Sequence, residues 1–248
     1  MSIVYIFIFS FGAIIGSFLN VVILRFNTGD SFLKGSSKCF SCSKKLSWYE
    51  LIPIFSFLIQ KGRCRRCGSK ISWQYPIVEI ITGGLFLLVA FGGGNIFRMF
   101  YLWVLASLLM IMAVYDLRHQ IVPNVFVYIF DILAFLALFG ISEVLPNFLS
   151  GVAFFSFFAL LWLISKGKWM GFGDAKLALG LGWLLGPSLT ISAFLFSFWL
   201  GALFGICLLL FNRSKITIKS RVPFAPFLIL GSLISFLVKL DIIKIFYG

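Results

Sequence analysis

Apolar residues occur in long runs that polar residues seldom interrupt. A run of roughly 18 or more residues with few charges is long enough to cross a bilayer as a helix. The pattern predicts about eight membrane helices, near residues 3–24, 76–91, 99–115, 122–139, 144–164, 175–185, 189–211 and 223–246. The sixth run is shorter than the others. We therefore expect an all-α protein that crosses the membrane several times.

Composition supports this expectation. Hydrophobic residues make up 61% of the 248 residues, and charged residues make up 12%, about half of what a soluble domain carries. A cleaved signal peptide would begin with a basic segment. Residues 1–11 contain no Lys or Arg, so the first helix is predicted to remain in the protein.

The positive charge is unevenly placed. A net charge of +13 could indicate binding to nucleic acid. If the eight helices alternate in direction, however, 18 of the 21 Lys and Arg residues fall on one side, in residues 25–75, 117–121, 165–176 and 212–222. Lys and Arg collect in cytoplasmic loops. This predicts both termini outside, the long loop in the cytosol, contact with anionic lipids and no nucleic-acid partner.

One connection differs from the rest. Residues 25–75 carry four of the five cysteines and ten of the basic residues, and form the only candidate for a folded domain outside the membrane. We therefore expect a first transmembrane helix at 1–24, a cytosolic tetracysteine domain at 25–75 and a multi-helix membrane domain at 76–248. The repeated, broken helices typical of many transporters are not evident.

The long loop contains two CxxC pairs, Cys39 with Cys42 and Cys64 with Cys67. Two such pairs can supply four thiolates to a tetrahedral zinc ion. The alternatives are two disulfides or reactive redox pairs, which a reducing cytosol makes less favourable for this loop. Cys207 lies within a predicted helix and is interpreted as an ordinary thiol.

Carboxylates inside the membrane are costly and usually functional. Asp116 ends the third predicted helix and Asp174 begins the sixth, so both are expected at the cytosolic membrane face. Two close carboxylates share a proton, and such a pair can hydrolyse a peptide bond as aspartic proteases do. The alternative for each aspartate is a helix cap or an interfacial charge. Asp131 lies deeper in its helix, where it could line the same cavity or pair with a polar group.

Gly171 and Gly173 both precede Asp174, in the sequence Gly-Phe-Gly-Asp. Glycine permits close approach of another backbone, so we expect these residues to form a substrate-backbone loop beside the acid. A GxGD tetrapeptide is not specific by itself, because glycine is common in membrane helices.

Five ordered motifs together resemble the type IV prepilin peptidases, also called prepilin leader peptidases and N-methyltransferases. They are GSFLNVVILR at 16–25, the cysteine segment at 39–79, DLRHQIVPN at 116–124, GFGDAKLALGLGWLLG at 171–186 and PFAPFLILG at 223–231. The chain departs from the usual family pattern at Phe40, Asn124 and Ala225, which stand where proline, aspartate and glycine are frequent.

The resemblance implies a GxGD-type aspartic endopeptidase of the bacterial inner membrane, with Asp116 and Asp174 as its catalytic pair. Its partners would be prepilins or pseudopilins, cleaved on the cytosolic side. The cysteines would bind structural zinc. Many relatives then methylate the new N terminus with S-adenosylmethionine; Glu50 and Glu79 would contact the cofactor or the pilin amine, or else form structural ion pairs. The remaining alternatives are a peptidase without methyltransferase activity and a non-enzymatic channel or assembly protein.

Overall fold

The computed structural model describes residues 2–29, 31–140, 143–211 and 223–238. In these ranges the regular elements are helices. The described residues also form two isolated β-bridges but no sheet. The chain divides into two compact units, residues 1–111 and 112–248. Each unit is described by itself.

The first unit is built on a pair of packed helices, α1 (Ser2–Arg25) and α3 (Gln74–Phe91). The two backbones approach closely at glycines: a Cβ added to Gly12 would lie 2.9 Å from the Cα of Gly83. Small residues allow such contacts where lipid provides no hydrophobic force between helices. The long loop between α1 and α3 contains a 3-10 turn, η1 (Trp48–Glu50), and a short helix, α2 (Phe55–Ile59).

Helix α4 (Ile96–His119) begins in the first unit and ends in the second. Within the first unit, the indole Nε1 of Trp103 donates a hydrogen bond to the carbonyl of Phe86 at 3.1 Å, and the two rings stack with centroids 4.9 Å apart. This contact attaches α4 to α3.

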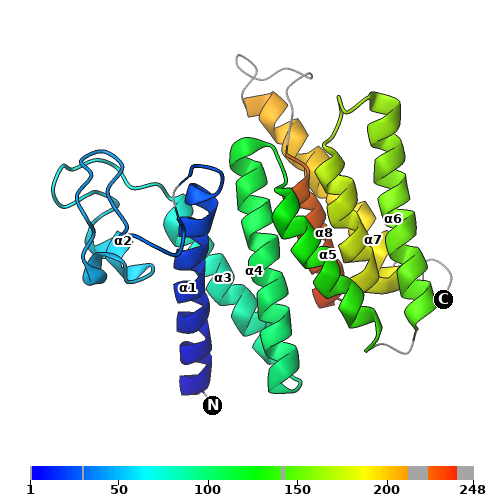
Figure 1. Cartoon of the computed structure of the whole chain (residues 1–248), viewed down its shortest axis with the longest axis horizontal. Coiled ribbons are helices and arrows are strands. Elements are labelled where there is room, and N and C mark those ends of the chain that lie inside the picture. Colours follow the sequence, from blue (N-terminus) through cyan, green and yellow to red (C-terminus); the bar gives the residue numbers. More distant parts are fainter. Residues whose placement is uncertain (1, 30, 141–142, 212–222, 239–248) are drawn as a thin grey trace. The chain divides into compact units, whose positions relative to one another are not determined.

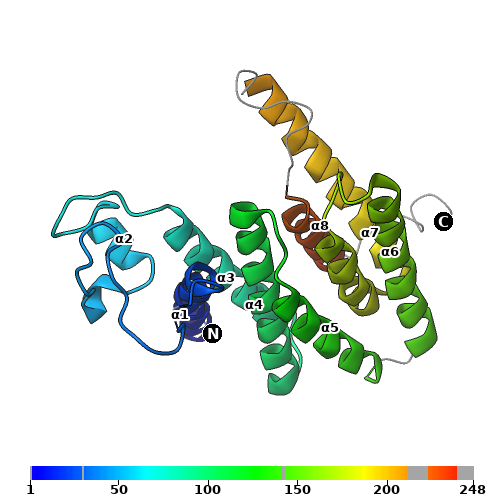
Figure 2. The same cartoon turned by 45° about the horizontal axis from the view of Figure 1, so that its top comes forward.

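In the second unit, α7 (Phe172–Phe211) packs against three other helices. They are α5 (Asn124–Leu138), α6 (Val144–Ser165) and α8 (Ala225–Val238), and they follow the colour order from green to red in Figures 1 and 2. Glycines again set the spacing, because a Cβ added to Gly182 of α7 would lie 2.6 Å from the Cα of Gly151 in α6.

Helix α7 is interrupted in its middle. Gly186 has φ 72° and ψ 177°, a conformation that favours glycine, and Pro187 follows it. Proline has no N–H for the carbonyl four residues earlier, which belongs to Trp183. The side-chain Nδ2 of Asn147 in α6 donates to that carbonyl instead, at 3.4 Å. The interruption is therefore a built feature with its own hydrogen-bond partner.

The all-α membrane fold and the position of the cysteine loop between the first two long helices are confirmed. The number of spans differs from the predicted eight. Among the described residues, five helices are long and apolar enough to cross a membrane, namely α1, α3, α4, α6 and α7. Helices α5 and α8 are shorter, and the sixth and seventh predicted runs meet in α7. Residues 239–246 of the last predicted run lie outside the described part.

Candidate functional site

Asp116 lies one turn before the end of α4 and is 4% exposed. The backbone N–H of Ala225, the first residue of α8, donates a hydrogen bond to its carboxylate. The N-terminus of a helix carries unpaired N–H groups and a partial positive charge, which stabilise an anion. One oxygen of Asp116, Oδ2, has no hydrogen-bond partner among the described residues.

Asp174 is the third residue of α7 and is 5% exposed. Its carboxylate accepts a hydrogen bond from the backbone N–H of Gly171, just before the helix. This is the reach-back contact by which a third-residue acid caps a helix. Asp174 keeps its other oxygen, Oδ1, without a partner among the described residues. The residue thus caps its helix and still has an oxygen available.

The second unit brings these two aspartates together. Asp116 is close enough to Asp174 to act on it electrostatically. The carboxylates therefore lie in the same part of this unit, where α4 ends and where α7 and α8 begin. Two helix N-termini supply N–H donors to a pair of acids, and each acid retains one unpaired oxygen. A buried polar atom without a partner is unusual in a protein and needs an explanation, such as a catalytic role.

The two glycines before Asp174 have different surroundings. A Cβ added to Gly173 would lie 2.9 Å from the Cβ of Val122, so this glycine is needed for packing within the protein. A Cβ added to Gly171 would meet only Asp174 and the backbone N of Gly173, at ordinary contact distances. Gly171 is exposed. Of the two, only Gly171 has open space for another chain beside the acid.

A third acid, Asp131, faces α7 from α5. Its Oδ1 also lacks a hydrogen-bond partner among the described residues, and it lies near the place where Gly180 has no side chain. Lys176 of α7 attracts Asp131 electrostatically and donates hydrogen bonds to Asn124 Oδ1 at 3.0 Å and Tyr128 Oη at 2.9 Å. Pairing with a polar group was one of the two interpretations of Asp131 from the sequence, and Lys176 is such a group. The sequence did not identify Lys176, Asn124 or Tyr128 as members of this α5–α7 polar cluster.

The four loop cysteines form one cluster. The Sγ atoms of Cys39, Cys42, Cys64 and Cys67 all lie within 4.8 Å of one another, and all four thiols are free. The Sγ atoms of Cys39 and Cys67 are 3.8 Å apart. A tetrahedral zinc ion with bonds of about 2.3 Å would separate its sulfur ligands by about 3.8 Å. The donor set therefore fits zinc.

The two halves of this cluster share one hydrogen-bond pattern, displaced by 25 residues. In the first half, the N–H of Cys39 donates to Lys44 O at 2.9 Å; in the second, Cys64 donates to Ser69 O at the same distance. The antiparallel bridges Lys38–Lys45 and Arg63–Lys70 repeat with the same displacement. The sequence shows the repeat only through the CxxC spacing.

The surroundings of the thiols favour a bound cation. Backbone N–H groups, from Cys42 first, and the Ser69 hydroxyl lower the pKa of the Cys39 thiol to about 6. The backbone N–H of Lys44 does not offset burial and neighbouring sulfurs, which raise the pKa of Cys42 to about 11. A metal ion would bind the sulfurs as thiolates and displace their protons, so four neighbouring sulfurs would be stable around it.

Glu50 is buried in the same loop and fully engaged. Its carboxylate accepts hydrogen bonds from Lys44 Nζ at 3.0 and 3.1 Å and from the backbone N–H of Ser47 at 2.9 Å. The Ser47 N–H and the Lys44 ammonium lower the pKa of Glu50. These contacts match the structural ion pair that was one of the two hypotheses for this residue.

Glu79 of α3 is also buried and holds a strained turn. Its Oε2 accepts a hydrogen bond from the backbone N–H of Ile54 at 2.7 Å. Ile54 has φ 63° and ψ −55°, and the N–H of Phe55 donates to Pro53 O at 2.6 Å, which defines a γ-turn. A β-branched residue at positive φ is a genuine outlier. Sequence reasoning identified Glu79 but not this partner, which is 25 residues away.

Comparisons with known proteins cover most of the chain. Residues 10–92 match the bacterial peptidase A24 N-terminal domain, and residues 103–206 match the type IV leader peptidase family. The first match contains the four clustered cysteines, and the second contains Asp116 and Asp174. No solved structure matches the chain significantly.

Three curated relatives are named prepilin leader peptidase/N-methyltransferase. The Bacillus subtilis (strain 168) protein is 36% identical over 96% of this chain and 96% of its own length. The Myxococcus xanthus (strain DK1622) protein is 35% identical over 83% of this chain and 63% of its own length. The Klebsiella pneumoniae protein is 32% identical over 73% of this chain and 84% of its own length.

Proposed function

Because the chain belongs to the type IV leader peptidase family, we propose that it is a membrane aspartic endopeptidase that removes the leader peptide from type IV prepilins or pseudopilins. The observation that carries the proposal is the buried pair Asp116 and Asp174, with one unpartnered oxygen on each residue. An enzyme of this kind needs two carboxylates at one place, and the location of Asp116 and Asp174 on different helices of one unit supports this proposal.

The pair performs hydrolysis by exchanging protons. One carboxylate is ionised and takes a proton from a water molecule, whose oxygen attacks the carbonyl carbon of the scissile bond. The other is protonated and gives its proton to the carbonyl oxygen. The first carboxyl then gives the proton it took from water to the leaving nitrogen as the C–N bond breaks. The second carboxylate takes a proton back from a hydroxyl of the tetrahedral intermediate, which becomes the new carboxyl group, and the pair returns to its starting state. The N–H groups of Gly171 and Ala225 hold the carboxylates in position during these steps.

Gly171 is the proposed point of approach for the substrate. It is exposed, and a side chain added there would not clash with the protein. An extended pilin segment could pair with this backbone and bring its scissile bond to the aspartates. Gly173 supports the loop through its contact with Val122.

The membrane orientation is part of the proposal. Lys and Arg residues concentrate in residues 25–75, 117–121, 165–176 and 212–222. These connections share one side if the two segments of α7, before and after Gly186, each cross the membrane. This asymmetry supports cytosolic placement of the cysteine loop and of both aspartates, with both termini outside. The protein is then a multi-pass protein of the bacterial inner membrane whose site opens to the cytosol.

Substitution of each aspartate tests the peptidase. Asp116→Asn and Asp174→Asn keep the side-chain size and remove proton exchange, so each is expected to slow cleavage of a co-expressed prepilin at least about 100-fold. Asp131→Asn is the matched control, because Asp131 also has an unpartnered oxygen in the same unit. It should process prepilin at nearly the normal rate at equal protein abundance. Normal cleavage by either dyad variant, or equal losses in all three, would contradict the assignment.

Methylation is the second proposed activity. S-adenosylmethionine would supply a methyl group to the new N-terminal amine of the pilin. Glu50 accepts hydrogen bonds from Lys44 and Ser47, and Glu79 accepts one from Ile54, so both carboxylates already have partners within the protein. The contacts fit a structural role for Glu50 and a positioning role for Glu79. Mass spectrometry of processed pilin distinguishes the alternatives: an unmethylated N terminus would leave a peptidase without methyltransferase activity.

Zinc is the proposed occupant of the cysteine cluster. The four thiols would hold the ion, which would join the two halves of a loop that has little apolar core of its own. A structural metal of this kind contributes directly to folding.

A further inference from the structure

An apolar surface of the cysteine loop has no partner in the described protein. Helix α2 exposes three residues at positions i, i+3 and i+4: Phe55 at 64%, Leu58 at 61% and Ile59 at 68%. Trp73, which follows the second CxxC pair, is 68% exposed. We call these four residues the interface patch. Contiguous apolar surfaces of this kind usually contact a membrane or another molecule.

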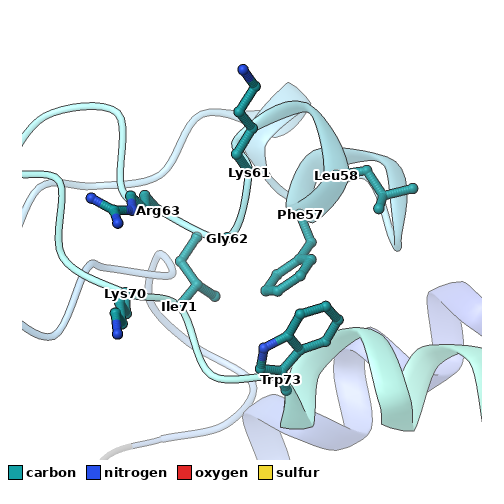
Figure 3. A pocket seen from close by; sticks show the side chains of 8 residues that line it. All are labelled: Phe57, Leu58, Lys61, Gly62, Arg63, Lys70, Ile71 and Trp73. Carbon is teal, nitrogen blue, oxygen red and sulfur yellow. The ribbon is translucent and has the colours of Figure 1, made fainter.

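A pocket of about 400 Å³ lies beside the patch. The rings of Phe57 and Trp73 face each other within it, with centroids 4.8 Å apart (Figure 3). Gly62 closes one side: its φ is +65°, and a Cβ there would lie 3.1 Å from the Phe57 ring. The pocket therefore has an aromatic interior that is open to the surroundings through Trp73.

Three basic residues surround this aromatic interior. Lys61, Arg63 and Lys70 line the pocket, and their side chains point outward from it (Figure 3). In the described part of the chain, the ion pair is Lys44 with Glu50, and none of these three residues has an acidic partner. Apolar residues ringed by unpaired cations are typical of segments that lie in the headgroup region of anionic bilayers.

The patch is continuous with a lipid-facing helix surface. Trp73 immediately precedes α3, a helix long and apolar enough to span the membrane. Ile77, Ile80 and Ile81 share its face of α3 and are 46–48% exposed. Tryptophan is enriched at the ends of membrane helices, where its ring lies at the headgroup level. Chain connectivity therefore places the patch next to the bilayer surface.

From these observations we propose that the cysteine loop docks on the membrane surface, with the interface patch inserted among anionic phospholipid headgroups and Lys61, Arg63 and Lys70 contacting their phosphates. The loop would then be fixed by two attachments, its covalent ends and this docked surface. The inference concerns the first unit alone and does not depend on the proposed peptidase activity.

Hydrogen–deuterium exchange of the full-length protein in nanodiscs tests the proposal. A five-residue helix opens easily, so its amides report whether the surface is docked. The amides of α2 are expected to exchange more slowly in discs containing phosphatidylglycerol than in discs of phosphatidylcholine alone, and added salt should reduce the difference. Each basic residue near an anionic surface shifts docking about fivefold, so loss of three should shift it on the order of 100-fold.

Two matched triple variants separate this site from general charge attraction. Lys61→Gln, Arg63→Gln and Lys70→Gln together should abolish the lipid dependence, whereas Lys34→Gln, Lys38→Gln and Lys45→Gln together should retain it. Unchanged exchange at Cys64–Gly68 shows that the loop remains folded. Equal exchange of the wild type in both lipids, or equal loss in both triple variants, would overturn the proposal. Protection that appears only when a prepilin is added would also overturn it, since the surface would then bind substrate. Prepilin cleavage in neutral discs is measured separately, so that a failure of membrane docking and a failure of the proposed peptidase activity are distinguishable.

Discussion

The acidic residues with buried oxygens differ in the hydrogen-bond partners that the protein gives to those oxygens. Glu50 has an ammonium and a backbone N–H, and Glu79 holds a backbone N–H. Asp116, Asp131 and Asp174 each keep one oxygen without a partner among the described residues. An unsatisfied buried polar group costs about 1–3 kcal/mol, which a structural site would avoid. The unpartnered oxygen alone does not identify a catalytic residue, because Asp131 has one too. Asp174 is distinguished by the electrostatic effect of Asp116 on it, whereas Asp131 is attracted by Lys176.

The Glu50–Lys44 pair predicts a pH dependence of loop stability. The lowered pKa of Glu50 means that its stabilisation is complete above its ordinary value of 4.5 and is lost as pH falls through the lower folded value. The raised pKa of Lys44 means that its contribution is present below 10.5 and is lost at higher pH. Scanning fluorimetry of the full-length protein should therefore show Glu50→Gln unfolding at a lower temperature than the wild type near neutral pH.

The same comparison at acid pH provides the control. Once the wild-type Glu50 is protonated, it resembles the glutamine variant, and the two unfolding temperatures should converge. A temperature difference that stays constant down to pH values well below 4.5 would mean that the ion pair does not stabilise the loop.

Glu79 is expected to act by positioning the Ile54 turn. Glu79→Ala removes the acceptor of the Ile54 N–H, and loss of a hydrogen bond to a charged group costs about 1.5–3 kcal/mol. Glu79→Gln keeps an oxygen acceptor and should be milder. Amide exchange at residues 54–59 should rise strongly in the alanine variant and only slightly in the glutamine variant. Equal exchange in both variants would contradict the positioning role.

At this scale the sequence identified residues whose signals are local. The cysteines were found from their CxxC spacing, and the aspartates from charge at helix ends. The Glu79–Ile54 contact could not be found, because nothing near either residue indicates a partner 25 positions away. Gly173 is predicted to give room to a substrate backbone, and its packing against Val122 is a second reason for glycine at this position that only the tertiary structure reveals.

At the scale of elements, α7 shows how a break in an apolar helix is stabilised. Gly186 supplies the positive φ, Pro187 starts the second segment with a fixed φ and no unused donor, and Asn147 pairs the carbonyl that Pro187 leaves open. Three residues from two helices thus provide the backbone conformation and the hydrogen-bond donor that the break requires. Lipid chains offer no hydrogen bonds to an open carbonyl.

Replacement of Asn147 tests this arrangement. Asn147→Leu leaves the Trp183 carbonyl without its donor and should lower the free energy of unfolding by about 1–3 kcal/mol. Ser156→Ala is a control in the same helix, because the exposed Ser156 hydroxyl bonds only to the carbonyl of Val152. It should change stability by less than about 0.5 kcal/mol. Denaturation of both variants in detergent measures the difference; similar losses would show that Asn147 has no special role.

Helix positions were predictable, but the number of membrane spans was not. Hydropathy located every long helix, because each carries a sustained apolar run. It could not show that residues 175–185 and 189–211 meet at the Gly186–Pro187 break, since both sides are equally apolar. Nor could it show that α5 ends before the apolar run that contains it, because helix ends depend on packing and backbone partners.

At the scale of the whole molecule, the two units carry different chemistry. The first contains the cysteine cluster, the Glu79-supported turn and the interface patch, and the second contains the aspartate pair. The two family models divide the chain in the same order. Loss of the proposed zinc ion should therefore affect the loop first.

Metal removal tests this separation. The purified protein is expected to contain about one zinc ion per chain, and Cys39→Ser with Cys42→Ser should abolish it. Elemental analysis measures the metal, while hydrogen exchange should show faster exchange in residues 37–71 and little change in α7. Cys207→Ser, which alters a cysteine outside the cluster, should retain the zinc. Absence of zinc from the wild type, or equal zinc in all variants, would contradict the metal assignment.

The contact between Asp116 and the start of α8 also has a consequence in time. The ribosome makes α4 and α7 before α8, so both acids are synthesised before the N–H of Ala225 exists to hold one of them. A nascent chain therefore carries its two acids through the membrane-insertion machinery with the site unfinished. If Asp116 and Asp174 are the catalytic pair, we expect peptidase activity only after α8 has been made, because α8 supplies the N–H that Asp116 accepts.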